Sequence, residues 1–181
     1  MTLNQKKSGS LAEVLKRVLL YGILFLLLIS AQSSFFSNLH ICPATPDLLL
    51  GAVVAIILID SKKAGVISAI CAGVITDAIG GSGYSLSPLF FLLFAGVISV
   101  FSEKMLPVFS SYLILLIPAV IMKAAYTCLC IFAAYGSLPL EYTAKNILLP
   151  EAICTFVLCL AVYPLSKLFM RPLGMRNRFS F

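Results

Sequence analysis

Apolar residues gather in six segments of this chain, and short polar stretches separate these segments. They cover residues 18–31, 45–59, 64–79, 86–101, 108–135 and 146–165. A transmembrane helix needs about 20 mainly apolar residues, so the first two segments must include flanking polar residues, or lie in a thinned bilayer, in order to cross. The pattern predicts an all-α, polytopic membrane protein with six transmembrane helices and short loops.

Two of the segments carry signals of helix geometry. In the second, Thr45 is the expected N-cap, Pro46 stands where a missing N–H costs nothing, and the Asp47 carboxylate suits the positive end of the helix. A single helix over residues 108–135 would be about 42 Å long at 1.5 Å per residue. We therefore expect this helix to tilt, to kink at Pro118 or to project from the bilayer.

The third segment carries small residues at a four-residue spacing, Gly65, Ala69 and Gly73, and the same spacing ends in Asp77. Positions four apart lie above one another on a helix, so these residues form a groove that ends in a carboxylate. Small residues let two helices approach closely. The groove is expected either to pack against a helix of the same chain or to receive the helix of a partner protein.

Composition supports the membrane class. The chain of 181 residues is 61% hydrophobic and 11% charged, whereas a soluble domain carries about 25% charged residues. The net charge of +6 would also suit nucleic acid, but the basic residues stand in short clusters beside apolar segments, as juxtamembrane charges do. We therefore expect membrane lipids and not nucleic acid as partners, and one membrane domain over residues 1–181.

The basic clusters also orient the chain. With six spans and a cytoplasmic N-terminus, eleven of the thirteen basic residues are cytoplasmic, as the positive-inside rule favours. The expected division is a basic cytoplasmic N-terminus at 1–17, a six-helix bundle at 18–168, and a basic cytoplasmic tail at 169–181 that either lies on the anionic leaflet or docks a cytoplasmic filament. Alternatively, the first segment is the core of a cleaved signal peptide, which leaves five spans and an external N-terminus.

Three charged residues, Asp77, Lys123 and Glu151, lie within apolar segments. A charge at the bilayer centre costs about 2.5 to 3.5 kcal/mol on the insertion scale, so partners are expected. The flexible stem of Lys123 can reach either carboxylate. We predict an intramembrane charge network in which Lys123 pairs with Asp77 or with Glu151, either as a structural tie or as a proton or ligand site. Asp60 and Glu103 stand beside lysines in cytoplasmic turns and are expected to be solvated.

The sequence carries no arrangement typical of an enzyme or a metal site. His40, the single histidine, and Cys42 fall in a predicted external loop and are too few to hold a metal. The other cysteines lie in apolar segments, where a thiol behaves as a small hydrophobe, so no disulfide framework is expected. The glycine-rich turn at 80–83 lacks the lysine of a phosphate-binding loop. We predict no catalytic residue, no metal and no cofactor.

The stretch from Pro46 to about Ser99 resembles the family of the rod shape-determining membrane protein MreD. The likeness rests on Pro46-Asp47-Leu48-Leu49-Leu50, the basic turn Lys62-Lys63, Gly73 and Asp77 in the third segment, and Ser87-Pro88-Leu89. Chain length and six spans agree with this family. Its six-helix arrangement is in turn similar to the substrate-binding subunits of energy-coupling-factor transporters.

The resemblance implies a non-enzymatic scaffold, multi-pass in the bacterial inner membrane, that helps maintain rod shape by organising lateral peptidoglycan synthesis. Its implied partners are MreC, a single-span protein, and with it MreB, RodA and a class B penicillin-binding protein. We expect the face of Gly65, Ala69, Gly73 and Asp77 to contact the MreC helix. The alternative is the substrate-binding membrane subunit of a vitamin-type transporter, whose cavity would lie among the third, fifth and sixth segments.

Overall fold

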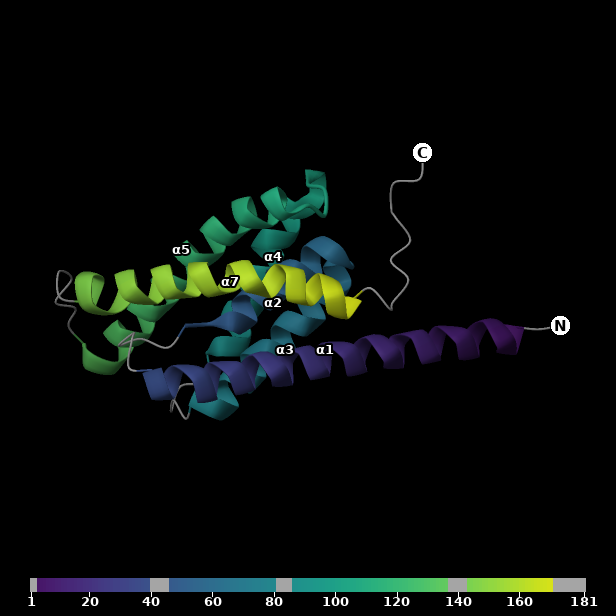
Figure 1. The fold of residues 1–181 in the computed structure, drawn as a ribbon, viewed down its shortest axis with the longest axis horizontal. Coiled ribbons are helices and arrows are strands. Elements are labelled where there is room, and N and C mark those ends of the chain that lie inside the picture. The colour runs from purple at the N-terminus through teal and green to yellow at the C-terminus, as the bar shows by residue number, and fades with distance from the viewer. Residues whose placement is uncertain (1–2, 40–45, 81–85, 137–142, 171–181) are drawn as a thin grey trace.

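The computed structural model describes residues 3–39, 46–80, 86–136 and 143–170. Over these residues the chain consists of helices without strands, which confirms the all-α prediction (Figure 1). The long elements are α1 (Leu3–Leu39), α2 (Leu48–Ile59), α3 (Lys62–Gly80), α4 (Ser87–Phe101), α5 (Phe109–Tyr135) and α7 (Leu149–Met170). A 3-10 turn, η1 (Ser102–Lys104), follows α4, and a π-helix, η2 (Ala144–Leu148), runs directly into α7.

Four stretches of these helices are long and apolar enough to cross a membrane: Leu15–Ser33, Ser87–Lys104, Phe109–Ala133 and Lys145–Met170. Their outward side chains are largely apolar, and residues such as Leu26 and Val100 are about two-thirds exposed, at 66% and 68%. A soluble monomer rarely exposes so much contiguous apolar surface. The outer surface is therefore compatible with a surrounding lipid phase.

Helix α2 lies inside the bundle. Every residue from Leu48 to Leu58 is buried, and the helix contacts α1, α3, α4, α5 and α7. In Figure 1 it lies behind α7 and between the outer helices. Because it is covered on all sides, its sequence is apolar throughout and shows no polar stripe. Its 12 residues span about 18 Å, less than the roughly 30 Å of a bilayer's hydrocarbon core.

Helix α1 is longer than the apolar segment that predicted it. It spans 37 residues, which is about 56 Å at 1.5 Å per residue, and its first part projects beyond the bundle (Figure 1). It packs on the bundle through Leu24, Phe25 and Leu28, which lie three and four positions apart on one face. In contrast, α3, α4 and α5 begin and end within two residues of the predicted segments. Helix α5 continues through Pro118 as a single helix.

The small-residue face of α3 is covered by helices of the same chain. A Cβ atom added at Gly65 would overlap Ile57 of α2, and one added at Gly73 would lie 2.5 Å from the Cα of Pro88 at the start of α4. Ala69, between them, is fully buried. Of the two alternatives that the sequence left open, the structure shows internal packing. The prediction that this face receives an MreC helix is therefore corrected, because α2 and α4 occupy the space beside it.

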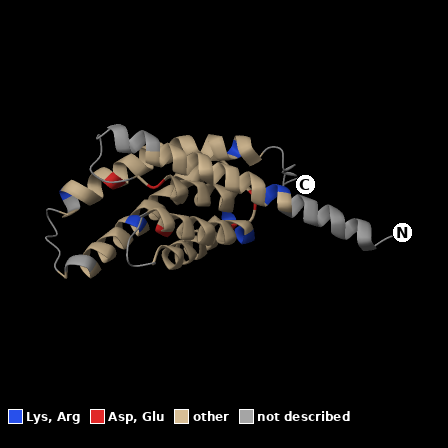
Figure 2. Cartoon of the chain, turned by 90° about the horizontal axis from the view of Figure 1, so that it is seen from below, with Lys and Arg blue, Asp and Glu red and all other residues tan. Residues whose placement is uncertain are grey.

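Three side-chain contacts place several helix ends together. Arg17 of α1 binds Asp60 after α2, Lys62 of α3 binds Glu103 after α4, and Tyr163 of α7 donates to the carbonyl of Pro107 before α5. The chain thus returns repeatedly to the end of the bundle at which α1 begins and α7 ends (Figure 1). Lys and Arg gather near this end (Figure 2).

Some predictions concern residues outside the described ranges. They are those for His40 and Cys42 in an external loop, for residues 81–83 of the glycine-rich turn, and for the basic tail from residue 171 onward. These stay predictions.

Candidate functional site

Asp47 is the N-cap of α2. Its backbone is extended, and its Oδ1 atom accepts a hydrogen bond of 3.3 Å from the backbone N–H of Leu50. A carboxylate in this position satisfies one of the free N–H groups of the first turn and suits the positive end of the helix dipole. The helix-start role predicted for Asp47 is confirmed. The predicted N-cap, Thr45, was wrong by two positions.

The second carboxylate oxygen of Asp47 binds Lys123. The Nζ atom of Lys123 lies 2.9 Å from Oδ2 of Asp47, and the two side chains are only 14% and 4% exposed. The sequence predicted Asp77 or Glu151 as the partner of Lys123, and the structure corrects this to Asp47. A buried pair is favourable only if further hydrogen bonds satisfy the remaining polar atoms. Asp47 meets this requirement through its bond to the N–H of Leu50.

The main chain of Asp47 is held by α7. Its N–H donates to Oγ1 of Thr155 at 3.3 Å, and its carbonyl accepts a weak hydrogen bond of 3.7 Å from the Sγ atom of Cys159. One residue at the start of α2 therefore joins α5 and α7. A further tie lies one turn along α2, where the Tyr112 hydroxyl of α5 lies 3.4 Å from the Gly51 carbonyl and donates to the Cys159 carbonyl of α7 at 2.8 Å. Nothing in the sequence pattern marked Thr155 or Tyr112.

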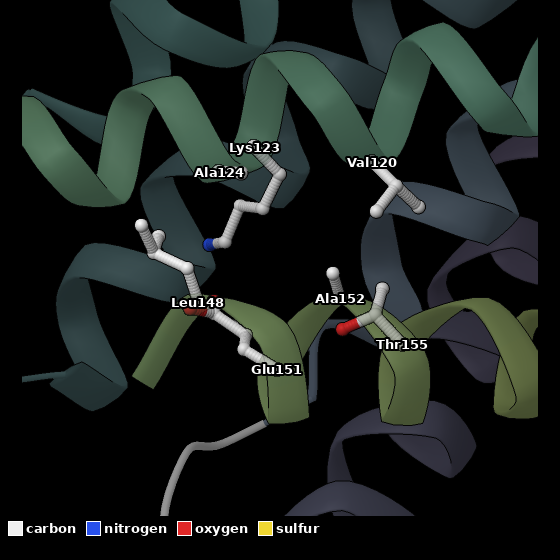
Figure 3. Close-up of a pocket in the computed structure, with 7 residues that line it drawn as sticks. All are labelled: Val120, Lys123, Ala124, Leu148, Glu151, Ala152 and Thr155. Atoms are coloured by element: carbon white, nitrogen blue, oxygen red, sulfur yellow. The ribbon is translucent and has the colours of Figure 1, made fainter. Parts of the chain in front are cut away.

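A small pocket lies beside the ion pair, between α5 and α7. Its volume is about 10 Å³, and it is lined by Val120, Lys123, Ala124, Leu148, Glu151, Ala152 and Thr155. Figure 3 shows Lys123 reaching from α5 towards Leu148 of η2 and Glu151 of α7, with Val120 and Thr155 at the opposite side of the pocket. A space of this size holds about one water molecule.

Glu151 is the second carboxylate of this site. It is 8% exposed, and its Oε1 atom accepts a hydrogen bond of 3.4 Å from Oγ1 of Thr127. The structure thus brings two of the predicted network residues, Lys123 and Glu151, to one pocket. We call the group of Asp47, Lys123, Glu151, Thr127 and Thr155 the interior polar cluster.

Asp77, the third predicted network residue, lies partly buried near the end of α3. Tyr126 of α5 interacts electrostatically with Asp77 and connects the helices around it. Its hydroxyl lies 3.0 Å from Oγ of Ser87, its ring stacks on Phe90 with centroids 4.4 Å apart, and the Lys123 Nζ atom lies 5.7 Å from its ring centre. The last distance is within the range of a cation–π contact. Pro88, beside Ser87, forms the α4 side of the contact with Gly73.

At the other end of the bundle, Asp60 is held by α1. Both carboxylate oxygens accept from Nη1 of Arg17, at 2.7 and 2.9 Å, and Oδ2 also accepts from the hydroxyl of Tyr21. The Asp60 side chain is 10% exposed, so the prediction that it is solvated was wrong. Glu103 is 60% exposed, and it pairs with Lys62 of α3.

Cys154 of α7 is disulfide-bonded, whereas Cys71, Cys128, Cys130 and Cys159 are free thiols. The sequence did not predict this disulfide. Cys154 had been assigned to an apolar segment and interpreted as a small hydrophobe. The pattern of the sequence gave no signal that set it apart from the other cysteines.

Among the described residues, no group of three or more His, Cys, Asp or Glu side chains is placed to hold a metal ion. Comparison with protein-family models, curated proteins and solved structures finds no match for this chain. The interior polar cluster is therefore interpreted from its own geometry. It holds three helices together, and it contains one carboxylate, Glu151, that the ion pair does not use.

Proposed function

We propose that this chain is a non-enzymatic scaffold in the bacterial inner membrane, part of the cell-elongation machinery that MreD-like proteins serve. In this proposal the outer apolar surface contacts the transmembrane helices of partners such as MreC. The observation that carries the proposal is that the buried charged residues are bound within the protein. Asp47 and Lys123 form an ion pair, and Asp47 also bonds to α2 and α7. The pocket beside them has room for about one water molecule.

The same pocket weighs against the alternative of a vitamin-type carrier. Sites for small organic ligands have volumes of about 300 to 1,000 Å³. The pocket beside Lys123 measures about 10 Å³. A carrier would have to open this part of the bundle, which would break contacts of Lys123 or Thr155 with Asp47. A scaffold does not require the bundle to open.

We further propose that the chain crosses the membrane six times, with both termini in the cytoplasm. The support is that α1 begins and α7 ends at one end of the bundle, where basic residues gather (Figures 1 and 2). Helix α2 would count as a crossing although it is short, with Pro46 and Asp47 continuing the path within the protein. Non-helical backbone is tolerated at membrane depth where protein buries it, and both residues are buried.

For the partner contact, the outer face of α4 is the surface that we favour. A Cβ atom added at Gly96 would meet nothing within 4 Å, and exposed Leu93 and Val100 flank this position. A glycine on an exposed apolar face lets another helix approach closely, which is how helices associate in lipid. Helix α4 also belongs to the stretch that resembles MreD. Gly22 of α1 is equally open but lies outside that stretch.

The two glycines provide a matched test. Gly96→Leu and Gly22→Leu both add a side chain in open space, so both variants should keep a normally folded bundle. Each is co-expressed with MreC from a rod-shaped bacterium and purified through a tag on this chain. We expect Gly96→Leu to lower the recovered MreC at least tenfold and Gly22→Leu to leave it unchanged. Full recovery with Gly96→Leu would contradict the α4 contact, and absence of MreC from the wild-type preparation would contradict the scaffold proposal.

A second measurement addresses the carrier. Native mass spectrometry of the purified wild-type chain should show protein and lipid masses only. A vitamin-sized molecule bound at one copy per chain would reject the scaffold proposal in favour of the carrier.

A further inference from the structure

The interior polar cluster contains one cation for two carboxylates. Lys123 is the cation, and Asp47 and Glu151 are the carboxylates; all three side chains are largely buried. Separating an ionised group from water costs several kcal/mol unless it is paired and hydrogen-bonded. Which of the two carboxylates is compensated therefore decides the charge state of the cluster.

Asp47 is well compensated as an anion. It receives the Lys123 ammonium at 2.9 Å and the N–H of Leu50 at 3.3 Å, and it stands at the positive end of α2. Charge-assisted bonds of this kind are among the stronger hydrogen bonds in proteins. Lys123 is therefore the counter-charge of Asp47.

Glu151 has much weaker compensation. Its hydrogen bond from Thr127 is 3.4 Å long, at the outer limit for such a bond, and comes from a neutral hydroxyl. The free N–H groups of a helix belong to its first four residues. Because η2 (Ala144–Leu148) runs into α7, the helical stretch begins at least seven residues before Glu151. Those free N–H groups therefore lie away from its carboxylate.

Three charged or polar groups face Glu151 from the elements packed against it. Lys123 and Thr127 come from α5, and Asp47, which interacts with Glu151 electrostatically, stands at the start of α2. Lys123 extends towards the Glu151 side of the pocket in Figure 3, but the ion pair that it forms is with Asp47. The pocket between Lys123 and Glu151 has room for about one water molecule and offers the two to four polar partners that a buried water needs.

We propose that Glu151 is a proton-binding site inside the bundle, and that one water molecule in the pocket connects its carboxyl group to the Lys123 ammonium. Binding converts the carboxylate and one proton from solvent into a neutral carboxyl group, with no other bond formed or broken. The neutral acid is the favoured form, because Lys123 then has only one carboxylate, Asp47, to compensate. Ionised Glu151 draws Lys123 away from Asp47 and loosens the start of α2. This inference depends on the bundle alone and not on the proposed scaffold function.

Infrared spectroscopy of the purified chain in lipid tests the site directly, because a protonated carboxyl group has a carbonyl stretching band that a carboxylate lacks. We expect such a band in the wild type at neutral pH and its loss in Glu151→Gln. The matched control is Glu103→Gln, which changes an exposed glutamate and should leave the band unchanged. A wild type without the band, or a band that persists in a folded Glu151→Gln variant, would overturn the proposal.

Thermal unfolding gives an independent measurement. Wild-type stability should fall as the pH is raised and Glu151 ionises, by a few degrees in melting temperature for each kcal/mol lost. Glu151→Gln keeps the shape of the neutral acid, so its melting temperature should match that of the wild type at low pH and vary less with pH. Equal pH dependence of the two proteins would contradict the proposal. If Glu151→Gln does not fold, Thr127→Val replaces it in the infrared experiment. Removal of the Thr127 hydroxyl should then shift the carbonyl band of Glu151, and an unshifted band would again contradict the proposal.

Discussion

The Nζ atom of Lys123 lies 2.9 Å from Oδ2 of Asp47, although the two residues are 76 positions apart in the sequence. This pair joins the middle of α5 to the N-cap of the interior helix α2. Because Asp47 also caps α2 and bonds to Thr155 of α7, the pair determines how three helices meet. It is therefore the first target for testing what stabilises the bundle.

Replacing Lys123 by Met should strongly destabilise the bundle. The substitution retains a side chain of similar length but leaves the Asp47 carboxylate buried without its cation. Removing one partner of a buried pair typically costs about 3 to 5 kcal/mol. The measurement is the free energy of unfolding in mixed micelles titrated with a denaturing detergent.

The control for Lys123→Met is Lys62→Met, which breaks an exposed pair. The Lys62 and Glu103 side chains are 42% and 60% exposed, and such pairs contribute about 0 to 1 kcal/mol. The double variant Lys123→Met with Asp47→Asn should recover part of the lost stability, since no unpaired charge remains. Equal losses for Lys123→Met and Lys62→Met would show that the buried pair has no special role.

Gly73→Ala should destabilise the chain, whereas Gly96→Ala should not. An added Cβ at Gly73 would lie 2.5 Å from the Cα of Pro88, so α3 and α4 must separate; at Gly96 it meets nothing within 4 Å. Overpacking of this kind costs about 1 to 3 kcal/mol. At Gly96 the higher helix propensity of Ala should leave stability unchanged or raise it by up to about 1 kcal/mol. The measurement is thermal unfolding of both variants, each compared with the wild type. A Gly73→Ala protein as stable as Gly96→Ala would contradict the close packing of α3 on α4.

Arg17→Gln should loosen α1 from the bundle. The guanidinium of Arg17 binds both carboxylate oxygens of Asp60, and its loss leaves this largely buried carboxylate with Tyr21 as its remaining described partner. We expect a loss of about 1 to 3 kcal/mol, the usual cost of a buried polar group whose partner is removed. Glu103→Gln, at the exposed pair, is the control. Limited proteolysis reports on α1: faster cleavage around residue 17 is expected in Arg17→Gln, and an unchanged cleavage rate would argue against the tie.

The cysteines should differ in their reaction with an alkylating reagent. Cys154 is disulfide-bonded and should react only after reduction. Cys71 is exposed on the outer surface of α3 and should react without treatment if the reagent enters the lipid phase, whereas the buried Cys159 should react only after unfolding. Peptide mapping by mass spectrometry, with and without reduction, follows each site. Alkylation of Cys154 in the unreduced, folded chain would contradict the disulfide.

The apolar pattern was sufficient to predict the class of fold and the extent of α3, α4 and α5. It underestimated α1, because the polar residues on both sides of its apolar core continue the same helix. Apolar content reports where a helix can be buried and does not report where it ends. The four-residue spacing at Gly65 and Gly73 correctly indicated close packing, but spacing alone could not say which helix fills the groove.

The interior polar cluster was only partly predictable for a related reason. Asp47, Lys123 and Glu151 could each be marked as unusual, since charges within apolar segments need partners. The choice of Asp47 as the partner of Lys123 depends on which helices are neighbours, and periodicity within one helix contains no such information. Asp60 shows the same limit: the nearby lysines suggested a solvated turn, whereas its partner Arg17 lies 43 positions away.

The position of α2 at the centre of the bundle has a consequence for biosynthesis. A ribosome completes α2 before it has made Lys123, Thr155 or Cys159, the residues that hold Asp47 in place. The nascent chain therefore contains an apolar helix whose capping carboxylate has no cation until more than seventy further residues have been added. Final packing of α2 follows the synthesis of α5 and α7, so a chain that stops before α7 should be recognised and degraded as an incomplete product.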